Sequence, residues 1–143
     1  MKYKLIIDPQ REESIELVWH ERSPIADKIE ALLGEASDHI LGYRDFDVYR
    51  LSLSEIDCVY TQGDDVCAMV GGECYRLRMR LHEIEELFGE SFVKLNRGCI
   101  VRISSIAKFE SSLGGSLRAI LKNGFGDYIS RRELKNVKRR FGL

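Results

Sequence analysis

The spacing of apolar and polar residues along this 143-residue chain predicts a mainly β protein, α+β overall, with antiparallel strands and short helices. Between residues 48 and 129, most apolar residues alternate with polar ones or form short runs rich in β-formers. Gly71-Gly72 and Asn123-Gly124 each separate two such runs, which indicates two tight hairpins. Helical spacing is clearest at residues 81–88.

The first 40 residues predict a small β-β-α appendage that precedes the main domain at residues 45–143. Residues 3–8 and 14–20 have the composition of two strands. Ser23-Pro24 then fits the start of a helix that runs to about residue 36. Such a segment is too small to hold a core alone, so we expect it to serve dimerisation or the binding of a partner protein.

Composition excludes several classes of protein. Apolar residues make up 44% and charged residues 31% of the chain, which is ordinary for a globular protein. No apolar run approaches the roughly 20 residues of a membrane-spanning helix, and the first residues do not fit a signal peptide. The four cysteines form no Cys-x-x-Cys motif, so we expect a cytoplasmic protein with reduced thiols and no metal site.

Signals of enzyme chemistry are weak. The three histidines are scattered, and none is set beside a Cys or Ser in a recognisable nucleophile arrangement. The chain has no glycine-rich phosphate-binding motif, because its Gly pairs belong to turns. We therefore expect no catalytic residues and no cofactor.

The net charge of −1 averages two opposed halves. Residues 1–93 hold 10 Lys and Arg against 20 Asp and Glu, a balance of −10, whereas residues 94–143 hold 12 against three, a balance of +9. Such an asymmetry indicates either a polyanionic partner, such as nucleic acid, or two halves that dock on each other.

Two clusters in the basic half carry candidate chemistry. The first surrounds Asn96-Arg97-Gly98, which we expect to form a loop between a helix and a strand. Arg binds guanine O6 and N7 in the major groove, and Asn binds adenine N6 and N7. The second follows Ser130 at the start of the terminal helix, where a hydroxyl and two guanidiniums suit a phosphate. The candidate DNA-binding residues are Lys94, Asn96, Arg97, Arg102, Ser130, Arg131, Arg132, Lys135, Lys138 and Arg139.

An alternative interpretation of the second cluster is a solvated basic helix whose last-turn cations favour the helix dipole. It accounts for residues 138–140, but not for Arg131 and Arg132 at the positive end of the helix.

The order of these motifs resembles the LytTR family of bacterial DNA-binding domains. The resemblance rests on residues 92–103, Leu121-Lys-Asn-Gly124 and Tyr128-Ile-Ser-Arg-Arg132, and it covers residues 45–143. The start of the chain, residues 4–9, is similar to small stand-alone LytTR regulators without a receiver domain.

This resemblance implies an elongated antiparallel β fold whose loops, rather than a recognition helix, enter successive major grooves. It implies that Arg97 and Arg132 are the main base readers. The family's third contact falls on the loop at residues 63–65, where Asp64 and Asp65 are poor neighbours for DNA. Arg102 stands where the family usually has Asn, and we expect it to add a contact to the DNA backbone.

The sequence therefore predicts a transcriptional regulator that binds double-stranded DNA sequence-selectively, as a homodimer that a partner protein regulates. The competing hypothesis is a protein-interaction module whose basic half docks on an acidic partner. RNA binding is disfavoured because no aromatic platform is interleaved with the basic residues.

Overall fold

The computed structural model describes residues 4–12 and 14–143, and the chain divides into one unit that ends at Leu33 and another that begins at Gly34. The helix α1, Pro24–Asp38, spans this boundary. It begins as its sequence predicts, because the Ser23 hydroxyl accepts a hydrogen bond from the N–H of Ala26 at 3.3 Å.

The two strands predicted before α1 are wrong for the residues described, since residues 4–12 and 14–23 form no strand. Residue 3, where the first was expected to begin, lies outside the described residues. A two-stranded hairpin without a sheet or a core to pack against is only marginally stable. Leu5, Ile7, Ile15 and Val18 are accordingly exposed in this unit.

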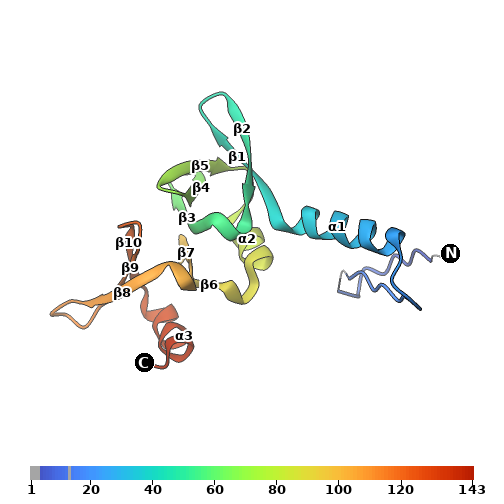
Figure 1. The fold of residues 1–143 in the computed structure, drawn as a ribbon. Helices are drawn as coiled ribbons and strands as arrows, with labels where there is room; N and C mark the ends of the chain where they lie inside the picture. Colours follow the sequence, from blue (N-terminus) through green and yellow to red (C-terminus); the bar gives the residue numbers. More distant parts are fainter. Residues whose placement is uncertain (1–3, 13) are drawn as a thin grey trace. The chain divides into compact units, whose positions relative to one another are not determined.

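Besides the last residues of α1, the second unit is built from two antiparallel sheets and two α-helices (Figure 1). Its elements are β1 (His39–Arg44), β2 (Asp47–Ser52), β3 (Ile56–Gln62), β4 (Asp65–Val70), β5 (Glu73–Leu77), α2 (Leu81–Phe88), β6 (Phe92–Asn96), β7 (Cys99–Arg102), β8 (Ile106–Ser111), β9 (Leu117–Leu121), β10 (Gly126–Ile129) and α3 (Arg131–Phe141). The seven-stranded sheet has the order β2-β1-β5-β4-β3-β7-β6, and the three-stranded sheet has the order β10-β9-β8. This confirms the mainly β, antiparallel fold.

Both faces of the seven-stranded sheet are covered by apolar side chains. Ile100 of β7 belongs to the cluster that includes Ile84 and Phe88 of α2. Its neighbour Val101 belongs to a second cluster, which includes Val137 of α3 and residues of the small sheet. Because adjacent strand residues point to opposite faces, strands covered on both sides carry few polar residues, and β4 and β7 have one each, Asp65 and Arg102.

Several elements match the sequence closely. α2 covers the residues that the helical spacing predicted, and Gly71-Gly72 and the turn before Phe125 form the two expected hairpins. β1 and β2 form a further hairpin, which turns at residues 45–46, at the start of the predicted main domain.

Candidate nucleic-acid interface

Arg97 lies at an exposed turn between β6 and β7. The sequence predicted a loop between a helix and a strand, and this was wrong because residues 92–96 form a strand. The turn is supported from inside by Asn96, a residue that is only 7% exposed. Its Oδ1 accepts from the N–H of Gly98 at 2.9 Å, and its Nδ2 donates to the carbonyl oxygen of Tyr128 at 2.9 Å. Both ends of the amide are thus engaged within the fold.

Gly98 brings the same turn against β3. The N–H of Thr61 donates to the carbonyl oxygen of Gly98 at 2.8 Å. A Cβ at position 98 would collide with the Thr61 hydroxyl, so only glycine fits here without moving the Thr61 side chain. The β3–β4 turn that follows Thr61 carries the exposed Asp64 and Asp65. The acidic loop noted in the sequence is therefore a neighbour of the Arg97 turn.

The start of α3 is attached to the strand that leads into the Arg97 turn. The N–H of Ser130 donates to the carbonyl oxygen of Leu95 at 2.9 Å. The Ser130 hydroxyl accepts from the N–H of Glu133 at 3.4 Å, as an N-cap does. Arg131 and Arg132 follow directly and are exposed in the first turn. The Leu95–Asn96 segment thus supports both places from which exposed arginines project.

These arginines have no carboxylate partners within the described part of the chain. None of the ion pairs formed by residues 4–12 and 14–143 involves Arg97, Arg131 or Arg132. Two of them stand at the N-terminal end of α3, where main-chain N–H groups and the helix dipole also favour an anion. The arrangement therefore leaves three guanidiniums available to an external polyanion.

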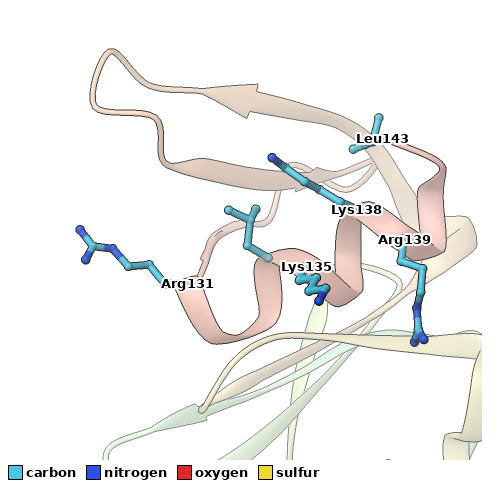
Figure 2. Close-up of a pocket in the computed structure, with 6 residues that line it drawn as sticks. Arg131, Lys135, Lys138, Arg139 and Leu143 are labelled. Atoms are coloured by element: carbon cyan, nitrogen blue, oxygen red, sulfur yellow. The ribbon is translucent and has the colours of Figure 1, made fainter.

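The basic side chains of α3 surround a shallow depression of about 480 Å³. Arg131, Lys135, Lys138 and Arg139 line it together with two leucines, and no acidic residue is among the lining residues. Figure 2 shows these cationic side chains extending outward from the helix. The positive charge of the second cluster is thus concentrated along one exposed side of α3.

Arg102, expected at the DNA backbone, is engaged inside the protein. Its Nε donates to the carbonyl oxygen of Ile56 at 2.8 Å, and its Nη2 donates to that of Leu53. The guanidinium lies 4.7 Å from the centre of the Phe92 ring, and its burial lowers the pKa of Arg102. These contacts assign Arg102 to the stability of the β3–β7 region rather than to a partner.

Lys94 is paired as well, because its Nζ lies 3.8 Å from a carboxylate oxygen of Glu85 on α2.

Arg140, which follows the basic residues of α3, donates from its Nη1 to the carbonyl oxygen of Phe92 at 3.2 Å and from Nη2 to that of Glu90. The sequence contained no signal for this anchoring, since the carbonyl acceptors lie some 50 residues before Arg140.

The described residues contain no group of three His, Cys, Asp or Glu side chains placed to hold a metal ion. In the same part of the chain, no helix has both the length and the apolar character needed to cross a membrane.

Comparison with known proteins places this geometry in a family. Residues 47–142 match the LytTr DNA-binding domain. An uncharacterised HTH-type transcriptional regulator of Staphylococcus aureus strain NCTC 8325 is 25% identical over 82% of this chain and 83% of its own length. A second such regulator, from strain MSSA476, is 24% identical over 100% of this chain and 99% of its own length.

A solved structure shares the fold. It is the LytTr DNA-binding domain of a protein described as a methyl-accepting/DNA response regulator from Bacillus cereus. It superposes with a TM-score of 0.69 at 14% identity, and the match covers 74% of this chain and 98% of that one. Since the family match alone spans well over half of the sequence, the chain belongs to the LytTR family of DNA-binding domains.

Proposed function

We propose that this protein is a cytoplasmic transcriptional regulator that binds duplex DNA sequence-selectively through its loops. One observation carries the proposal: two hydrogen bonds attach the Arg97 turn and the start of α3 to the same Leu95–Asn96 segment. They are the bond from the Ser130 N–H to the Leu95 carbonyl oxygen and the bond from the Gly98 N–H to the Asn96 side chain. Three arginines without an ion-pair partner among the described residues therefore project from one rigid segment. The family's DNA-binding character and the relatives named as transcriptional regulators support the proposal.

Arg97 and Arg132 are the proposed base readers. Each projects from a rigid support into solvent, and a guanidinium donates two parallel hydrogen bonds to guanine O6 and N7. In this proposal the Arg97 turn and the start of α3 enter successive major grooves.

Phosphate attraction is assigned to the neighbouring cations. Arg131 and the N-terminal end of α3 meet the DNA backbone directly, while Lys135, Lys138 and Arg139 add a salt-dependent attraction. Asn96, Ser130 and Arg102 act as positioning residues, because their side chains already form hydrogen bonds within the protein. Lys94 contributes less than the free arginines, because Glu85 offsets its charge.

The N-terminal segment, residues 1–40, is proposed to form a homodimer or to bind a regulatory partner. Leu5, Ile7, Ile15 and Val18 are between 70% and 86% exposed, and exposed apolar side chains gathered in one segment are typical of an interaction surface. A dimer would bind two half-sites, whose spacing reports the symmetry of the assembly.

Selection of bound sequences from a random duplex library tests this function. We expect a short motif rich in guanine at the positions read by Arg97 and Arg132. Binding of the selected duplex should show a steep negative slope of log affinity against log salt concentration. Arg97→Ala and Arg132→Ala should each reduce discrimination against mixed-sequence duplex by about 5- to 150-fold, the equivalent of about 1–3 kcal/mol.

Arg50→Ala is the matched control, because Arg50 is an exposed arginine on β2, at the opposite edge of the seven-stranded sheet from β6. It should leave discrimination unchanged. If the protein does not bind duplex DNA at low salt, or if Arg97→Ala and Arg132→Ala bind the selected sequence like the wild type, the proposed function is wrong. Binding to an acidic protein partner without any binding to DNA would favour an interaction module.

A further inference from the structure

The depression beside α3 has an apolar component that phosphate binding does not require. Leu134 and Leu143 line it together with the four cationic side chains. Phosphate contacts use charge and hydrogen-bond donors, and an exposed leucine adds neither. Leu143 is nevertheless 66% exposed at this place. The depression is therefore amphipathic, with cations around leucine side chains.

The end of α3 holds Leu143 in place. Gly142 adopts a left-handed conformation with φ of 67°, which ends the helix. The N–H of Leu143 then donates to the carbonyl oxygen of Lys138 at 2.8 Å. This is the hydrogen bond of a Schellman motif, and it folds the residue after the glycine back toward the last helical turn. Figure 2 shows Leu143 next to the last turn of α3, on the chain segment that leaves it.

The other leucine, Leu134, is held by the hydrophobic core. Leu134 is half-buried and packs against the core cluster that contains Val137 and Leu121. Its position is thus set by the core, while Leu143 is set by the helix cap. The depression thus holds two apolar side chains at fixed places, and about 480 Å³ of open space lies between the surrounding cations. Together they form a surface on which an apolar anchor group can pack.

We propose that this depression docks an acidic amphipathic segment of a partner protein, in which Asp and Glu side chains flank leucine or aromatic anchors. The partner's carboxylates would meet Lys135, Lys138 and Arg139, and its anchor would cover Leu134 and Leu143. The argument for this occupant is complementarity: the lining holds four cationic side chains, two leucines and no acidic side chain. The inference builds on the proposed function, because the partner would compete with DNA for the cations of α3.

A labelled synthetic peptide, acidic with interspersed leucine and phenylalanine, is the probe. Its counterpart has every leucine and phenylalanine replaced by serine and keeps all of its charges. We expect the full-length protein to bind the first peptide at least about tenfold more tightly than the second, because only the first fills the apolar part of the depression. Equal affinity for both peptides would show a simple polyanion attraction and would overturn the proposal.

Leu143→Ala is the decisive variant, because it removes the apolar contact and keeps every charge and the main-chain hydrogen bond to Lys138. We expect this variant to bind the leucine-containing peptide at least about fivefold more weakly and to leave the affinity for duplex DNA unchanged. Leu113→Ala is the matched control: Leu113 is fully exposed in the β8–β9 loop, and its loss should affect neither ligand.

The outcomes separate this inference from the proposed function. If Leu143→Ala weakens the binding of duplex DNA and of the peptide equally, Leu143 belongs to the DNA interface and the docking proposal is wrong. If the wild type binds the peptide but no duplex DNA, the docking proposal stands and the proposed function fails.

Discussion

The side-chain amide of Asn96 joins the β6–β7 turn to the end of β10, because its Nδ2 donates to the carbonyl oxygen of Tyr128 while its Oδ1 accepts from Gly98. Tyr128 lies two residues before Ser130, which caps α3. One buried side chain therefore fixes the distance between the Arg97 turn and the first turn of α3.

Asn96→Ala should destabilise the protein and also weaken DNA binding without removing a DNA contact. The change leaves the Gly98 N–H and the Tyr128 carbonyl without their partner, which costs about 1–3 kcal/mol of the free energy of unfolding. Urea denaturation measures this loss. Arg97→Ala, one residue away and exposed, should change stability by less than about 0.5 kcal/mol. A fully stable Asn96→Ala variant with only an altered base preference would show that Asn96 reads DNA.

Gly98→Ala should destabilise the turn because its new methyl group meets the Thr61 hydroxyl. Overpacking of this kind costs about 1–3 kcal/mol. Thr61→Ala removes the obstructing hydroxyl, so the double variant should recover part of the loss. The expected coupling in a double-mutant cycle is more than about 0.5 kcal/mol. Additive effects of the two changes would mean that the collision is not the cause.

Arg102→Met should lower stability by about 1–3 kcal/mol, because it removes the hydrogen bonds to the Ile56 and Leu53 carbonyls and the contact with the Phe92 ring. The salt dependence of DNA binding should stay as in the wild type. Arg131→Ala should show the reverse pattern, with unchanged stability and a slope that is less negative by about 0.9. A shallower slope for Arg102→Met would instead place its guanidinium at the DNA.

The buried thiols predict a loss of stability at high pH. Burial is the main cause that raises the pKa of Cys58 to about 12 and that raises the pKa of Cys99 as well. In the unfolded chain a thiol ionises near pH 8.5, so above about that pH the native state holds protons that the unfolded state has lost. The contribution of these thiols to the free energy of unfolding should therefore be constant below about pH 8.5 and fall as pH rises toward 12, by about 1.4 kcal/mol per pH unit for each buried thiol.

Urea denaturation across this pH range, with Cys58→Ala as the comparison, measures that slope, which should be shallower in the variant. Thiol reagents provide an independent check. Cys74 is exposed and should react in the native protein, whereas Cys58 and Cys99 should react only after unfolding. Rapid labelling of Cys58 in the native state would contradict the assigned burial.

Local sequence signals were sufficient for most of the second unit. The helical spacing of α2, the two glycine-containing hairpins and the Ser130 cap each depend on residues within a few positions, and each is present in the structure. β6 was harder, because a short apolar run buried on both faces has no period that separates strand from helix. β1 was missed because Gly42 is a poor strand residue; here Leu51 and Tyr75 occupy the space that its side chain would take.

In the candidate site, too, features that depend on neighbouring residues were predictable and features that depend on distant residues were not. Arg97, Arg131 and Arg132 could be placed on a turn and a helix start from neighbouring residues alone. The internal bonds of Asn96 and Arg102 could not be predicted, because their acceptors lie 32 and 46 residues away in the sequence. Side chains with the right chemistry for DNA are in these cases engaged by main-chain carbonyls that only the folded sheet brings near.

The Arg97 turn also bears on how such a protein acquires new targets. The turn is held by Asn96, by the Gly98 main chain and by Thr61, and none of these bonds uses the side chain of residue 97. The amino acid at position 97 can therefore change without rebuilding the scaffold beneath it, and under the proposed function such a change would alter the preferred DNA sequence.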